Sequence, residues 1–241
     1  MIAQNKFKIL VILFVFLTSV AVLIPTVRMR LLYEYIRYKF NYAADNVTII
    51  ERTALLPISH DFGYLYTHPK ATFKLPYEVE LVGIEDYGLH RLRANDKNTV
   101  VLVDLATFSA FYPANSFDVS KLSSHLQYVN QSEAKFIDYM LNIRSRDLKV
   151  FDSTSSSAFN FYMLMSKNLA FNNQRLTRPI EKTVMPSAIV YQMTKDLDNK
   201  HYKDLLFLRD NDESFQIVII SSELIEQEDV DLIISTIKFT D

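Results

Sequence analysis

The chain contains no cysteine in its 241 residues. Disulfides, thiolate nucleophiles, cysteine-ligated zinc and iron–sulfur clusters are therefore excluded. Glycine is almost as scarce, with three residues at Gly63, Gly83 and Gly88. Phosphate-binding loops need closely spaced glycines so that backbone N–H groups can approach the ligand. Neither GxGxxG nor GxxxxGK[ST] occurs in the sequence, which excludes these two nucleotide-binding motifs.

The sequence also lacks an excess of charge of one sign, because 26 basic and 28 acidic residues leave a formal net charge of -2. Composition thus gives no electrostatic footprint for nucleic acid, and we expect no nucleic-acid partner. The five histidines form no HxH or HExxH spacing. We therefore expect no metal and no other cofactor, and no catalytic residue can be assigned from a motif.

An uninterrupted apolar run is present at residues 9–27, without a charge and with fourteen Ile, Leu, Val or Phe among its nineteen residues. As a helix rising about 1.5 Å per residue, it spans close to the ~30 Å hydrocarbon core. The alternative, a buried core helix, would need a partner surface all round it. We predict a signal-anchor in residues 1–27, with anchor side chains Ile9, Leu13, Phe14, Phe16, Leu17, Leu23 and Ile24.

Cleavage and orientation of this segment stay open from the sequence alone. Residues 19–21 read Ser-Val-Ala, which resembles a signal-peptidase site, but apolar residues continue beyond it and favour retention. Basic residues flank the run on both sides, at Lys6 and Lys8 before it and at Arg28, Arg30, Arg37 and Lys39 after it. Long domains translocate largely regardless of charge. We expect a single-pass protein of a bacterial inner membrane with an extracytoplasmic C-terminal domain.

The next segment, residues 28–45, contains no helix breaker and places Leu31, Tyr35, Tyr38 and Tyr42 along one helical face. Tyrosines alternating with basic residues suit the headgroup zone of a bilayer. We predict a juxtamembrane helix that contacts the membrane or a membrane partner; the alternative is a helix packed on its own domain. The candidate contact residues are Tyr35, Arg37, Tyr38, Lys39 and Tyr42.

Residues 46–241 show no repeat and no firm internal boundary, so we expect one soluble domain. Residues 72–82 alternate apolar and polar side chains as a half-buried strand does, although Pro76 lacks a ladder donor. Residues 89–92 and 99–105 predict two further strands. Asn130 followed by Glu133 predicts a capping box that opens a helix to about residue 143, and a second helix is expected over 156–171.

The last third predicts strands at residues 188–194, 204–208 and 214–221, with a hairpin loop at 209–213. Residues 226–239 place Val230, Ile233, Ile234 and Ile237 on one helical face, with acidic residues near the helix N-terminus. Strands and helices are thus segregated along the chain rather than alternating. The predicted class is α+β, with an antiparallel sheet, a central helical pair and a closing C-terminal helix.

Three segments carry a resemblance to a known family: FKLP at residues 73–76, FQIVII at 215–220 and ISTIKF at 234–239. With this order of elements, the chain after the juxtamembrane helix resembles PsbP-like domains. The resemblance implies an accessory, largely non-enzymatic binding domain. None of the three segments is a motif specific to that family.

The hypothesis that follows is a single-pass, membrane-anchored binding or assembly protein without enzymatic activity. Its partners would be the lipid bilayer and another membrane or envelope protein. One alternative is a membrane-tethered hydrolase that uses His60, Asp61 or His68, which lie in a loop-like stretch. Another is a protective or immunity-type membrane protein, which the sequence does not separate from the first hypothesis.

Overall fold

The computed structural model describes residues 24–40, 47–56, 63–85, 88–96, 98–105, 108–112, 117–149, 153–171, 176–209 and 213–240. The predicted anchor lies outside these ranges apart from its last four residues, so nothing is placed for Ile9, Leu13, Phe14, Phe16, Leu17 or Leu23. Ile24 is described and is 39% exposed. Among the described residues, no helix is both long and apolar enough to cross a bilayer.

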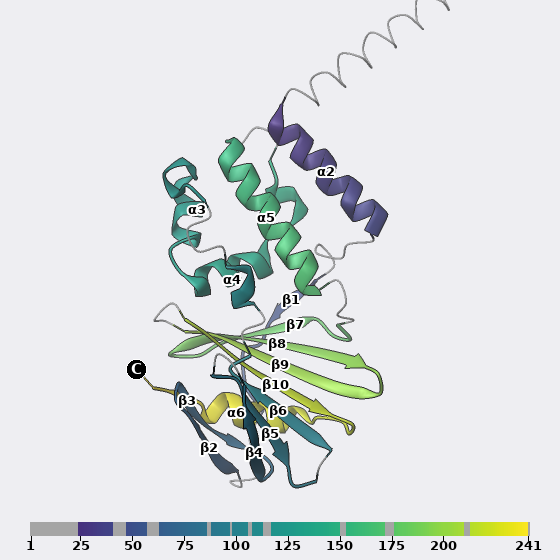
Figure 1. Ribbon diagram of the computed structural model, residues 1–241, viewed down its shortest axis with the longest axis vertical. Helices are drawn as coiled ribbons and strands as arrows, with labels where there is room; N and C mark the ends of the chain where they lie inside the picture. Colours follow the sequence, from purple (N-terminus) through teal and green to yellow (C-terminus); the bar gives the residue numbers. More distant parts are fainter. Residues whose placement is uncertain are drawn as a thin grey trace, which may run out of the picture.

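The fold is α+β, as predicted, and consists of a large sheet with helices on one side and a smaller sheet on the other (Figure 1). The described strands are β1 (Ile49–Glu51), β2 (Tyr64–His68), β3 (Ala71–Leu75), β4 (Val79–Ile84), β5 (His90–Ala94), β6 (Thr99–Val103), β7 (Ile180–Val184), β8 (Ala188–Leu197), β9 (Lys200–Arg209), β10 (Ser214–Ser221) and β11 (Lys238–Phe239). The described α-helices are α2 (Pro25–Phe40), α3 (Ser124–Val129), α4 (Glu133–Asn142), α5 (Thr154–Phe171) and α6 (Gln227–Thr236). Three 3-10 turns lie between them, at Ser109–Phe111, Val119–Lys121 and Ser145–Asp147.

The large sheet has eight strands in the order β1-β7-β8-β9-β10-β6-β5-β4, and the small sheet has the order β11-β3-β2. The predicted antiparallel sheet is correct for most neighbours, but β1 pairs with β7 in parallel, so the large sheet is mixed. At the other edge, β4 carries a bulge between Leu81 and Gly83 together with the charged Glu80. Bulges and charges on an edge strand oppose pairing with other chains.

Two hydrophobic cores lie on opposite faces of the large sheet. Successive side chains of a strand point to opposite faces, so Leu206 and Leu208 of β9 join the core under α2, α3, α4 and α5. Leu205 and Phe207 of the same strand join the core under α6 and the small sheet. Because both faces are covered, the central strands read as nearly continuous apolar runs rather than as alternating ones.

The C-terminal predictions are the most accurate. β9 and β10 form the expected antiparallel hairpin, closed by a hydrogen bond from the Arg209 amide to the Glu213 carbonyl (2.9 Å). The closing helix is confirmed as α6, which packs Val230, Ile233 and Ile234 into the core. It ends earlier than predicted, at Thr236, because the chain leaves the helix to pair β11 with β3.

The predicted strand at residues 72–82 is wrong as a single element. The alternating pattern runs through Pro76, but the chain bends at Pro76 and Tyr77 and separates β3 in the small sheet from β4 in the large one. The predicted helix cap is also displaced by two residues. Ser132, rather than Asn130, caps α4 by accepting a hydrogen bond from the Lys135 amide (3.3 Å), and Asn130 instead ends α3.

The predicted helical pair is confirmed as α4 and α5, which share one core, and α2 and α3 complete the helical layer. The helix expected after the anchor begins at Pro25 and is confirmed as α2. Tyr33 of α2 is fully buried in that core, and α2 lies beside α5 (Figure 1). The alternative of a helix packed on its own domain therefore describes one face of α2, while its other face stays exposed.

Candidate functional site

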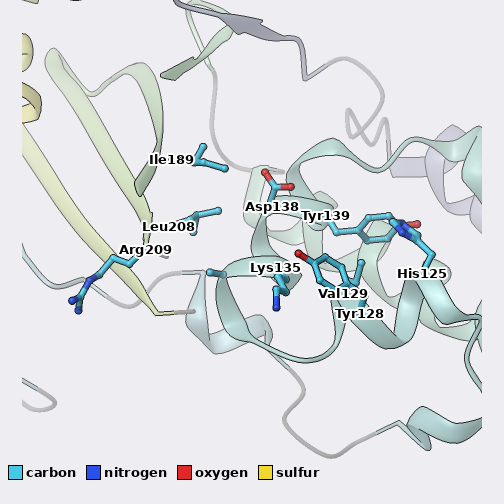
Figure 2. A pocket seen from close by; sticks show the side chains of 10 residues that line it. His125, Tyr128, Val129, Lys135, Asp138, Tyr139, Ile189, Leu208 and Arg209 are labelled. Atoms are coloured by element: carbon cyan, nitrogen blue, oxygen red, sulfur yellow. The ribbon is translucent and has the colours of Figure 1, made fainter. Parts of the chain in front are cut away.

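The site that the fold builds most clearly lies where the helical layer meets the ends of β8 and β9. Ile189 and Leu208 are paired across these two strands, and both side chains point toward the helices (Figure 2). Leu208 belongs to the helical core, and Ile189 packs against it. The two side chains form an apolar floor at the edge of the core.

The facing wall is made by α3, α4 and the turn between them. Phe136, Ile137, Met140 and Leu141 form the buried face of α4, as the helical spacing predicts. The remaining faces of α4 therefore carry the polar side chains. Glu133 holds the start of α4 in place. Its carboxylate accepts hydrogen bonds from Ser109 (2.6 Å) and from Ser214, which ties the start of α4 to the start of β10.

Between this wall and the floor lies a cavity of about 340 Å³, here named the α3–α4 groove. Its base is apolar, because Val129, Ala134 and Leu208 are nearly fully buried there. Its rim carries aromatic and charged side chains, of which Tyr128 is 55% exposed. The full lining consists of His125, Tyr128, Val129, Ala134, Lys135, Asp138, Tyr139, Ile189, Leu208 and Arg209.

The charged rim residues are held in place by neighbours. The Lys135 ammonium lies 4.4 Å from the centre of the Tyr128 ring, a cation–π distance. The carboxylate of Asp138 accepts a hydrogen bond from the Tyr191 hydroxyl (2.5 Å) and lies 3.7 Å from the Lys182 ammonium. Burial and then the nearby charge of Asp138 raise the pKa of Tyr191 far above its ordinary value, so this tyrosine stays a neutral donor.

Arg209 lines the groove where β9 ends, but its charge does not face the groove. Its guanidinium points away from the other lining residues in Figure 2. It donates to Glu213 (2.8 Å) and to the Thr240 carbonyl (3.1 Å), and it lies 4.8 Å from the centre of the Phe239 ring. These contacts hold the Arg209 side chain against the C-terminal strand β11, on the face of the sheet opposite the helices.

A second cavity of about 430 Å³ adjoins the groove, since His125 and Tyr139 line both. Their rings meet edge to face with centroids 5.4 Å apart. The Tyr139 hydroxyl donates to the Asn160 side chain (3.0 Å), which ties α4 to α5 at this point. The aromatic pair of His125 and Tyr139 therefore stands between the two cavities.

The residues nominated from the sequence lie elsewhere. Tyr35 and Tyr38 on α2 are 55% and 90% exposed, and Arg37 pairs with Glu34 at 3.5 Å. Tyr42 and the side chain of Lys39 lie outside the described residues. None of these described side chains lines the groove.

The histidine cluster of the hydrolase alternative is described only at His68, because His60 and Asp61 lie outside the described ranges. His68 is 2% exposed. Its Nδ1 accepts from the Lys70 amide (3.2 Å), and its Nε2 lies 3.2 Å from the Gly88 carbonyl, so both ring nitrogens bond within the fold. Its ring also packs edge to face on His90, with centroids 4.4 Å apart. In the described part of the chain, no group of three metal-ligating side chains comes together.

Sequence reasoning missed the groove because its residues come from four elements separated by up to 84 positions, between His125 and Arg209. The one local signal is the segment around Tyr128 and Val129, where an exposed tyrosine precedes a buried valine and a helix break. That pattern is common at helix ends, so it does not mark a site by itself.

Comparison with known proteins gives no relative: no protein-family model, no curated protein and no solved structure matches the chain.

Proposed function

We propose that the chain is a single-pass, membrane-anchored binding or assembly protein, and that the α3–α4 groove takes a large apolar side chain of another membrane or envelope protein. The observation that carries the proposal is the groove itself, with its apolar base and a rim of Tyr128, Lys135 and Asp138. Its volume of about 340 Å³ is at the small end of ligand pockets. A space of this size suits one anchoring side chain better than a whole cofactor.

The composition of the groove supports recognition of a polypeptide. Protein interfaces commonly bury an apolar or aromatic anchor in a pocket that polar groups surround. Tyrosine is enriched at such surfaces, because its ring gives apolar contact and its hydroxyl gives a hydrogen bond. Tyr128 offers both, Tyr139 offers its ring because its hydroxyl donates to Asn160, and Lys135 and Asp138 add charged groups to the same lining.

The membrane part of the proposal rests on the apolar run at residues 9–27, which leads directly into α2. We place the domain on the extracytoplasmic side of a bacterial inner membrane. Tethering confines the domain to the membrane surface, so a partner anchored in the same membrane meets the groove at a high effective concentration. A modest pocket then suffices for assembly.

The test is to fill the groove without unfolding the helix that carries it. Ala134→Leu adds three carbon atoms to a nearly buried position of the lining, and leucine favours the helical state almost as well as alanine does. Ala158→Leu makes the same chemical change at a partly buried position of α5 away from the groove and serves as the control. Circular dichroism of both variants checks that they fold.

Membranes that carry the full chain are cross-linked in place, solubilised in detergent and purified through a tag. We expect one reproducible partner with the original chain and with Ala158→Leu, and at least a tenfold loss of that partner with Ala134→Leu, which corresponds to about 1.4 kcal/mol. Recovery of no reproducible partner, or equal recovery with both variants, would contradict the proposal.

A further inference from the structure

The outer face of α2 carries a stripe of exposed apolar side chains, here named the α2 stripe. It consists of Leu31, Leu32, Tyr35 and Tyr38, which are 54%, 49%, 55% and 90% exposed. Their spacing keeps all four on one side of the helix. The opposite side buries Thr26 and Tyr33 against the domain. Packing on α5 thus fixes the direction in which the stripe points.

The charged side chains of α2 are mainly positive. Over residues 25–38, α2 has three arginines and a single carboxylate, Glu34. That carboxylate is paired with Arg30 at 2.7 Å and with Arg37 at 3.5 Å. Arg28, at the start of the helix, is exposed. Arg30 also donates to the Ser145 carbonyl and so faces the domain, whereas Arg28 lies one turn before Leu31 and Leu32 and places a positive charge beside the stripe.

The position of the α2 stripe along the chain limits what can cover it. The helix begins at Pro25, at the end of the apolar run of residues 9–27. A helix rises about 1.5 Å per residue, so Tyr38 lies only about 20 Å along the axis from Ile24. If the run crosses a bilayer, every residue of the stripe is within reach of that bilayer's surface.

We propose that the α2 stripe lies in the headgroup layer of an anionic lipid bilayer and orients the domain on the membrane. The inference rests on the membrane anchor of the proposed function. An interfacial helix buries its leucine and aromatic side chains at the boundary between headgroups and acyl chains, and its cations pair with lipid phosphates. Tyrosine is stable at this depth because its ring is apolar and its hydroxyl reaches water.

The chain itself supplies a clean test, because it contains no tryptophan. Tyr35→Trp introduces a single tryptophan on the stripe, and Tyr128→Trp introduces one at an equally exposed position, since both tyrosines are 55% exposed. Tyr38→Trp is a second stripe reporter, and its 90% exposure leaves room for the larger ring if Tyr35→Trp disturbs the fold.

The full chain is reconstituted into phosphatidylcholine vesicles with and without about 30% phosphatidylglycerol, which supplies the negative surface. Lipids brominated near the headgroup quench a tryptophan that lies at that depth. We expect blue-shifted emission and several-fold stronger quenching for Tyr35→Trp than for Tyr128→Trp, and more quenching with phosphatidylglycerol than without it. Arg28→Gln in the Tyr35→Trp background should reduce the gain that phosphatidylglycerol gives.

The outcomes separate the α2 stripe from the anchor. If the chain floats with the vesicles but Tyr35→Trp and Tyr38→Trp are quenched no more than Tyr128→Trp, the anchor stands and the inference about the stripe is overturned. The inference is also overturned if Tyr35→Trp is shielded only in native membranes, because a protein then covers the stripe. If the chain does not float with vesicles, the anchor fails and the inference fails with it.

Discussion

Replacing one partner of the ion pair between Arg52 and Asp231 should destabilise the whole domain. Asp231 lies on α6 and is fully buried. Its carboxylate accepts hydrogen bonds from Arg52 Nη1 (2.6 Å) and Nη2 (2.5 Å), in a bidentate arrangement. Asp231 also accepts from the Leu56 amide (2.6 Å), so the pair ties the segment after β1 to the helix under the sheet. The hydrogen bond to Asp231 is the main reason that the pKa of Arg52 is raised.

The expected magnitude follows from what each variant leaves behind. Removing one member of a buried ion pair typically costs about 3–5 kcal/mol, because the other charge stays buried without its partner. Asp231→Leu should fall at the lower end, about 3 kcal/mol, because Glu181 lies 3.7 Å from Arg52 Nη1 and retains part of the attraction. Arg52→Met leaves a buried carboxylate with two remaining donors, the Leu56 amide and Gln227 (3.0 Å), and should cost a similar amount.

The double variant should cost little more than either single one, since it removes both charges together. Urea unfolding of the full chain in a mild detergent, followed by near-ultraviolet circular dichroism of its 14 tyrosines, measures all four free energies of unfolding. If the costs of the two single variants add in the double variant, the two residues are not energetically coupled, and the reasoning from this geometry fails.

Three further predictions use the same unfolding measurement. Lys167→Met should lower the free energy of unfolding by about 1–3 kcal/mol, because the fully buried ammonium of Lys167 donates to two backbone carbonyls at the end of α4 (2.6 and 3.0 Å). An unchanged unfolding midpoint would refute this prediction. Ser132→Ala should lower the free energy of unfolding by about 1 kcal/mol, because it removes the cap of α4. Asn130→Ala should cost less, because the buried Oδ1 of Asn130 has no described hydrogen-bond partner, and the reverse order would favour Asn130 as the cap. Burial and then the nearby His68 lower the pKa of His90, while Asp104 raises it by a smaller amount. The unfolded chain therefore binds the proton more tightly than the folded chain, and stability should fall as the pH drops below about 6.5. His90→Gln should flatten that fall below about pH 6.5, and an equally steep fall would assign it to other groups.

The sequence predicted those elements whose pattern repeats over several turns or strand residues. β10 was placed at its observed bounds because the run from Phe215 to Ile220 is flanked by polar residues on both sides. The face of α6 was predicted because Val230, Ile233 and Ile234 follow the helical period. In both cases local pattern and tertiary packing require the same arrangement, so no information from distant residues was needed.

The elements that were missed are short or depend on distant partners. β1 and β7 form the parallel edge of the sheet, with Ile49 opposite Ile180, a pairing between residues 131 positions apart that leaves no local signature. The strand predicted across Pro76 failed because β3 and β4 have the same alternation although they belong to different sheets. The α3–α4 groove was also missed because it depends on distant partners. Its floor at Ile189 and Leu208 forms part of a cavity only where α3 and α4 pack beside β8 and β9 without covering these two residues.

The most direct test of the account is photo-cross-linking from the rim of the α3–α4 groove in native membranes. A benzophenone amino acid replaces Tyr128, which is 55% exposed, or Tyr64 of β2 in the small sheet, which is 52% exposed and serves as the matched control. We expect a discrete adduct with one membrane or envelope protein from position 128, no such adduct from position 64, and loss of the adduct when Ala134→Leu fills the groove. Adducts of equal yield from both positions, or an adduct that survives Ala134→Leu, would contradict the assignment of the groove as the binding site.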